Sequence, residues 1–124
     1  MSYRMLLVND ELNSEALYGE RLETQGFVIF HYMFGQEVIN DVRDGTLVYD
    51  IGLIDLSLPD VDGMQVIEYL KSVYPTVPLI SCSAYLQFGF HKSPLVDGTL
   101  AMPFGWEIMT SVINRHLPGA IKIA

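Results

Sequence analysis

Residues 51–63 read IGLIDLSLPDVDG, an apolar run that ends at a carboxylate and continues through a proline to an Asp-Gly pair. Residues 51–54 have the continuously apolar pattern of a strand that is buried on both faces of a sheet. Asp55 directly follows that run, and an unpaired carboxylate in such a place is costly unless a cation binds it. Asp62 and Gly63 are typical of a turn and a helix start. The stretch therefore predicts a central strand with a chemically active carboxylate at its end.

On both sides of this stretch, short apolar runs alternate with segments of helical periodicity. Strands are expected at residues 3–8, 27–32, 51–54, 77–82 and 99–102. Helices are expected on the apolar stripe 12–22 with a stop at Gly26, at residues 35–45, on the stripe 66–74 before Pro75, and on the stripe 109–117 before Pro118. Residues 87–98 have room for at most two helical turns because they contain a glycine and a proline. Such alternation implies a parallel sheet with helices on both faces.

Composition and charge limit the possible partners of the chain. Its 124 residues, 1–124, are expected to form one domain around a single core. Asp and Glu outnumber Lys and Arg by 15 to 7, and the net charge of -8 disfavours direct contact with nucleic acid. With no signal peptide and no apolar stretch of about 20 residues, we expect a cytoplasmic protein without membrane insertion. The lone cysteine, Cys82, is expected to be a buried apolar residue.

Polar side chains gather where the predicted strands end, which is the edge at which open parallel sheets bind ligands. The residues at these ends are Asn9, Asp10 and Glu11, then Asp55, then Ser83 and Ala84, and last Met102 and Pro103. Two carboxylates about 4 Å apart repel each other by about 4 kcal/mol at an effective dielectric constant near 20. A hard divalent cation such as Mg²⁺ would relieve that repulsion, and an aspartate beside it could accept a phosphoryl group. The alternative is structural, because Asn9 and Asp10 could cap a helix and Ser83 could satisfy a loop backbone.

Four segments resemble the receiver domain of two-component response regulators: LLVNDE (6–11), DLSLPDVDG (55–63), SA (83–84) and MPF (102–104). The pattern D-x-x-L-P-x-x-D-G is the specific part, and the resemblance covers nearly the whole chain. It implies an α/β fold with a flavodoxin-like, doubly wound, five-stranded parallel sheet. The fourth helix is expected to be shortened, because only 19 positions separate residues 83 and 102 (102 - 83).

The resemblance also implies roles for individual residues. Asp55 would be the phosphoacceptor, Ser83 the switch hydroxyl that binds the phosphoryl group, and Ala84 the small residue that leaves room for it. Asp10, Asp55 and the backbone carbonyl of Ser57 would bind Mg²⁺. The domain would then be regulatory and not an enzyme, except for self-catalysed phosphotransfer and dephosphorylation.

Three positions depart from the family pattern. Asn9 replaces an acidic residue and would reach the metal only through water, so the affinity for Mg²⁺ is expected to be weakened. Met102 replaces a lysine whose ammonium pairs with the phosphoryl group, an interaction of roughly 1.5 to 3 kcal/mol. Thr99 replaces an aromatic residue that reorients on phosphorylation. The proline of the motif is retained, and the peptide bond between Met102 and Pro103 is expected to be cis.

Two functional hypotheses follow. In the first, a histidine kinase or phosphotransfer protein phosphorylates Asp55, and the domain signals by contact with a downstream protein, with residues 86–90 and Trp106 as the candidate surface. In the second, the chain is a pseudo-receiver, a protein-interaction module that acts independently of phosphorylation. A true enzyme on this fold is disfavoured, since Ser57 stands where a haloacid-dehalogenase-type phosphatase needs a second aspartate.

Overall fold

The computed structural model describes residues 2–9, 12–83 and 93–122, with the backbone alone at residues 12–17. Five parallel strands form one sheet in the order β2-β1-β3-β4-β5. The strands are β1 (Tyr3–Val8), β2 (Phe27–Tyr32), β3 (Ile51–Asp55), β4 (Leu79–Ser83) and β5 (Gly98–Ala101). The helices are α1 (Leu12–Thr24), α2 (Gly35–Arg43), α3 (Gly63–Val73) and α4 (Trp106–His116). The doubly wound order predicted by the family resemblance is thereby confirmed.

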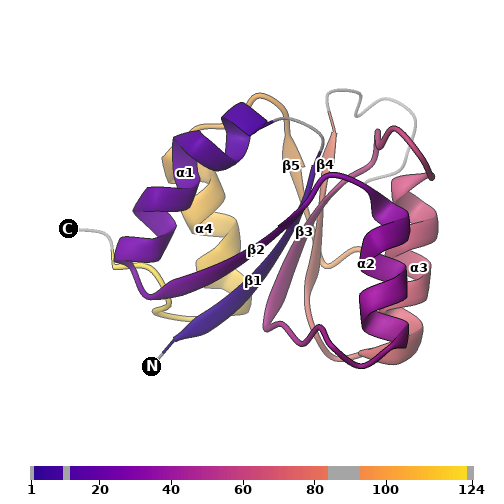
Figure 1. Cartoon of the computed structure of the whole chain (residues 1–124). Helices are drawn as coiled ribbons and strands as arrows, with labels where there is room; N and C mark the ends of the chain where they lie inside the picture. Colours follow the sequence, from indigo (N-terminus) through magenta and orange to yellow (C-terminus); the bar gives the residue numbers. More distant parts are fainter. Residues whose placement is uncertain (1, 10–11, 84–92, 123–124) are drawn as a thin grey trace.

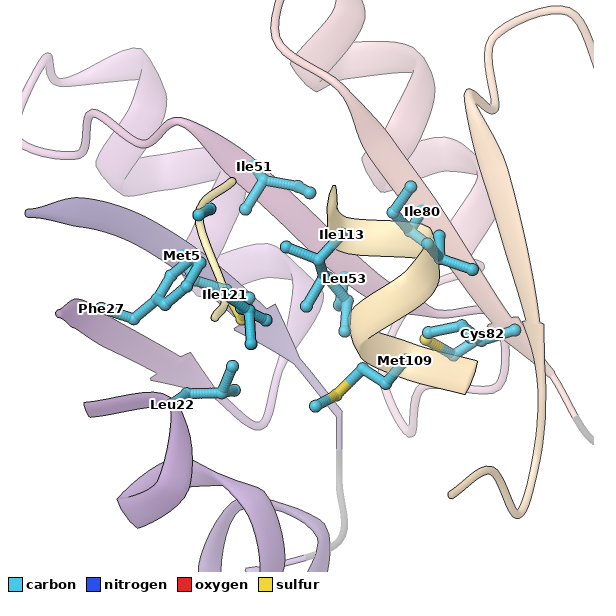
Figure 2. Packing of buried hydrophobic residues seen from close by; sticks show 13 residues of the cluster. Met5, Leu22, Phe27, Ile51, Leu53, Ile80, Cys82, Met109, Ile113 and Ile121 are labelled. Atoms are coloured by element: carbon cyan, nitrogen blue, oxygen red, sulfur yellow. The ribbon is translucent and has the colours of Figure 1, made fainter. Parts of the chain in front are cut away.

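Helices cover both faces of the sheet, with α1 and α4 on one face and α2 and α3 on the other (Figure 1). Side chains of a strand alternate between the faces, so that Met5 of β1 belongs to the apolar cluster beneath α1 and α4 and Leu6 to the cluster beneath α2 and α3. Figure 2 shows the first cluster, in which Ile113 and Met109 of α4 lie over the sheet. The central strand β3 is buried throughout, as its apolar sequence predicts.

Local sequence signals account for several of the element ends. Gly26 follows α1 with φ 95°, a conformation that glycine adopts at little cost. Asp62 caps α3 by accepting a hydrogen bond from the Met64 backbone N–H at 3.0 Å, which confirms the helix start predicted from the Asp-Gly pair. Strand β4 begins at Leu79, two residues after the predicted start, because Pro78 has no N–H for the sheet.

The short fourth helix was predicted within residues 87–98, and residues 87–92 of that segment lie outside the described residues. Of that segment the structure describes residues 93–97, which form a turn closed by a 3.1 Å hydrogen bond from the Val96 N–H to the Ser93 carbonyl. Within the described part of the chain, no helix is both long enough and apolar enough to span a membrane.

Candidate functional site

The carboxyl ends of four strands bring Asn9, Asp55, Ser83 and Met102 to one edge of the sheet. Val8 pairs with Ile54, so Asn9 and Asp55 follow at the same level of neighbouring strands. Asp55 in turn pairs with Cys82, and the Met102 N–H donates to the Ser83 carbonyl at 2.9 Å. For these four residues, this agrees with the convergence predicted from the sequence.

Asp55 is the buried carboxylate of this edge. Only 6% of its surface is exposed, and its Oδ1 accepts a 2.8 Å hydrogen bond from the Ser57 backbone N–H. That bond satisfies one carboxylate oxygen and fixes the orientation of the group. Burial, and then the negative charge of Asp55, raise the pKa of the adjacent Cys82 thiol. Cys82 is therefore a protonated core residue, as predicted.

Gly63 sets the path of the loop that follows Asp55. A Cβ at residue 63 would overlap the Asp55 carbonyl oxygen and lie 2.5 Å from the Leu56 Cα. The Gly63 N–H donates to the Leu56 carbonyl at 3.3 Å, and Ser57 and Asp62 form an antiparallel bridge across the loop. Only a residue without a side chain permits this close return to the end of β3.

Asp60 joins the same loop to α2, a contact that sequence reasoning missed. Its two carboxylate oxygens accept hydrogen bonds of 3.0 Å each from the backbone N–H groups of Gly35 and Gln36. Desolvation acts to raise the pKa of Asp60, but the hydrogen bonds from the Gln36 and Gly35 N–H groups outweigh it and hold the pKa below its ordinary value. One sequence signal indicated that α2 needs an acceptor from elsewhere: Phe34, the residue before the helix, has no side-chain oxygen that could cap it.

Neighbouring strands and helices position the remaining edge residues. The Asn9 N–H donates to the Tyr32 carbonyl at 3.0 Å, and the Asn9 carbonyl lies 3.1 Å from His31 Nε2. Ser83 and Asn9 are both buried, with 6% exposed surface each. The half-buried Met102 side chain packs against the apolar cluster beneath α1 and α4, and the Met102-Pro103 peptide bond is cis, as predicted.

Other predicted residues lie away from this edge or outside the described residues. Asp10 and Ala84 lie outside, as do residues 86–90 of the candidate contact surface. Thr99 lies within β5, paired with Ser81. Trp106, the other candidate for partner contact, is already half-buried, with the Arg21 guanidinium 4.1 Å from its ring centroid.

The metal donors that the structure describes are few. Among residues 2–9, 12–83 and 93–122, no three His, Cys, Asp or Glu side chains lie close enough together to hold a metal ion. The predicted oxygen ligands within these ranges are the Asp55 carboxylate and the Ser57 backbone carbonyl. A second carboxylate would have to come from Asp10.

Comparisons with known proteins identify the family and the fold of the chain. The family model described as the response regulator receiver domain matches residues 5–93. The transcriptional regulatory protein CssR of Bacillus subtilis (strain 168) is 33% identical over 68% of this chain, which spans 36% of CssR. The sporulation initiation phosphotransferase F of the same organism is 22% identical, and the match covers 95% of this chain and 96% of that protein.

A solved structure also has the same fold. The receiver domain of the sensor histidine kinase PA1611 from Pseudomonas aeruginosa PAO1, with a magnesium ion in its active-site cleft, matches with a TM-score of 0.81 and 21% identity, over 94% of this chain and 98% of that one. The chain therefore belongs to the response regulator receiver domain family of two-component signalling. Receiver domains are regulatory and are not classical enzymes.

Proposed function

We propose that the chain accepts a phosphoryl group on Asp55 with the help of Mg²⁺ and passes the signal on through protein contacts. The observation that carries this proposal is the buried Asp55 carboxylate at the end of the central strand, held by the Ser57 N–H at 2.8 Å. The donor would be a histidine kinase or a phosphotransfer protein. In support, the structural neighbour from PA1611 is the receiver domain of a sensor histidine kinase.

The transfer would form a bond between a carboxylate oxygen of Asp55 and phosphorus while the nitrogen–phosphorus bond of a phosphohistidine breaks. The donor nitrogen keeps the electron pair of the broken bond. Because the Ser57 N–H fixes the Asp55 carboxylate, the attacking oxygen is oriented before the donor arrives. The Ser83 hydroxyl, on the neighbouring strand, would donate a hydrogen bond to the transferred group.

The donor set suits Mg²⁺, which prefers carboxylate and carbonyl oxygens. Asp10, Asp55 and the Ser57 carbonyl would hold the ion, which when bound would supply positive charge beside the phosphoryl oxygens. Asn9 carries no charge and would contribute only through water, so the affinity is expected to be weak. Asn9→Asp should therefore bind Mg²⁺ more tightly than the wild type, as measured by calorimetric titration.

The pseudo-receiver hypothesis has one observation in its favour. Met102, which stands where the family has a phosphate-binding lysine, packs against the apolar cluster. A domain without this cation would couple the phosphoryl group less strongly to the rest of the fold. In this alternative, the partner-binding state is set by association and not by phosphate. The cytoplasmic location stays a prediction under either hypothesis.

Intact-mass measurement after incubation with Mg²⁺ and acetyl phosphate separates the two hypotheses. The wild type should gain one phosphoryl group, and Asp55→Asn should gain none. Asp50→Asn is the matched control, because Asp50 immediately precedes β3 at the opposite edge and accepts a hydrogen bond from the Arg4 N–H. No gain in the wild type at any Mg²⁺ concentration refutes phosphorylation, and a gain that persists in Asp55→Asn refutes the site.

A further inference from the structure

A cavity of about 310 Å³ lies between the sheet and the helices α1 and α4. Met5 and Leu53 of the sheet line one side, and Leu22 of α1 and Met109 of α4 line the other. The cavity is partly open to solvent, so a molecule can enter it from outside. A space of this volume is the size of a small ligand pocket.

The cavity reaches the edge of the sheet that carries the candidate phosphorylation site. Asn9 and Met102 belong both to that edge and to the lining of the cavity, together with Phe104. The Met102 N–H also bonds to the carbonyl of Ser83. A molecule in the cavity would thus touch a residue that is hydrogen-bonded to the proposed switch position.

The lining indicates an uncharged, largely apolar occupant. None of the described lining residues carries a formal charge, and most are aliphatic, aromatic or sulfur-containing. The Tyr18 hydroxyl already donates to the Phe104 carbonyl at 2.8 Å, and Cys82 is a buried member of the apolar cluster. The Asn9 side chain is the one amide in the described lining.

We propose that this cavity is a binding site for a small, neutral aromatic molecule of about two fused rings. The size follows from the volume, since a dry apolar cavity of about 150 Å³ holds one benzene ring and this one is about twice as large. Met102 contributes to the site by being apolar, because a lysine there would place an ammonium at the cavity. Ligand binding of this kind goes beyond phosphoryl transfer and does not depend on it.

Titration of the ¹⁵N-labelled full chain with indole, followed by amide chemical shifts, tests the proposal. We expect saturable binding with a dissociation constant on the order of 0.1 to 1 mM. The largest shifts should fall in β1, at Leu53 of β3, in β4, in the Tyr18–Leu22 part of α1, and in α4. Tryptamine, which adds an ammonium to the same ring system, should bind at least tenfold more weakly.

Two variants at residue 102 locate the site. Met102→Trp should fill the cavity and weaken indole binding at least tenfold, and Met102→Lys should weaken it by placing a charge there. Ile108→Trp is the matched control, because Ile108 of α4 is 61% exposed and does not line the cavity. This variant should bind indole with the affinity of the wild type. Circular dichroism identifies which variants are folded.

Three results would overturn the proposal. The first is non-saturable binding of indole or shifts confined to another surface. The second is equal affinity for indole and tryptamine. The third is an indole affinity equal to that of the wild type in a folded Met102→Trp or Met102→Lys variant.

Discussion

Removal of the Asp60 carboxylate tests how the loop after Asp55 is held in place. Asp60 bridges the loop and α2 through hydrogen bonds of 3.0 Å from the Gly35 and Gln36 N–H groups. Both N–H groups belong to the first turn of the helix, where the backbone has no partner within the helix. Asp60→Ala leaves them to water, whereas Asp60→Asn retains one acceptor oxygen and loses the charge.

The expected magnitude follows from these contacts. Loss of a capping side chain costs about 0.5 to 2 kcal/mol, and a negative charge at a helix N-terminus contributes about 0.3 to 1 kcal/mol. Asp60 is exposed, so solvent screening reduces the charge contribution. We therefore expect Asp60→Ala to lower the free energy of unfolding by about 1 to 1.5 kcal/mol, and Asp60→Asn to lower it by about half as much.

The effect must also depend on pH in a defined direction. The folded-state pKa of Asp60 is lowered from 3.8, so its contribution is fully present above the unfolded-state pKa and is lost as the pH falls through the folded-state value. Urea unfolding, followed by the fluorescence of the single tryptophan, Trp106, measures this at pH 7 and below pH 3. The difference in the free energy of unfolding between the wild type and Asp60→Asn should be smaller at the lower pH.

Glu68→Gln is the matched control, because Glu68 is an exposed carboxylate within α3. Its substitution should change the free energy of unfolding by less than about 0.5 kcal/mol. The reasoning is refuted if Asp60→Ala is no less stable than this control, or if the Asp60→Asn difference is the same at both pH values.

Three further substitutions test other contacts. Gly63→Ala should lower the free energy of unfolding by about 1 to 3 kcal/mol and slow acetyl phosphate labelling, because its methyl group would meet backbone atoms at the end of β3. Gly105→Ala is its control, since no described residue other than its two chain neighbours lies within 4 Å of that Cβ. Equal losses in the two variants would contradict the prediction. Lys71→Met should lower the free energy of unfolding, measured with urea, by about 1.5 to 3 kcal/mol, because Lys71 Nζ contacts Asp97 Oδ2 at 2.6 Å and the Lys71 side chain is only 11% exposed. A decrease of less than about 0.5 kcal/mol would contradict this prediction. Tyr49→Phe should leave the melting temperature equal or higher, because among the described residues the buried Tyr49 hydroxyl has no hydrogen-bond partner, and a clear decrease would show that it has one.

The strands were predictable because burial on both faces leaves a direct signal in the sequence. Residues 3–8 and 27–32 were predicted with their observed ends, and residues 51–54 were one residue short of β3. The fold order needed the family resemblance, since alternation alone allows several strand orders. The start of β4 was placed too early because the apolar run extends across Pro78, where the proline prevents sheet pairing.

The site residues were predictable for a similar reason, since the ends of parallel strands meet at one edge. Asn9, Asp55, Ser83 and Met102 needed only a correct strand assignment. The contact between Asp60 and α2 joins residues 24 and 25 positions apart. Phe34 indicates that α2 lacks a side-chain cap of its own, but no local pattern identifies Asp60 as the acceptor. The cavity depends on the spacing between the two helices and the sheet, which is likewise set by tertiary packing.

Met102 connects the two proposals, because it lies where the apolar cluster reaches the polar edge of the sheet. A lysine at this position would favour an anion on Asp55 and oppose an apolar molecule in the cavity. Met102→Lys should therefore strengthen any phosphate-dependent change by roughly tenfold to 150-fold while weakening indole binding. Amide shifts recorded with acetyl phosphate and with indole measure both effects on the same sample. If the variant strengthens or weakens both together, Met102 acts through the general stability of the domain and not through its charge.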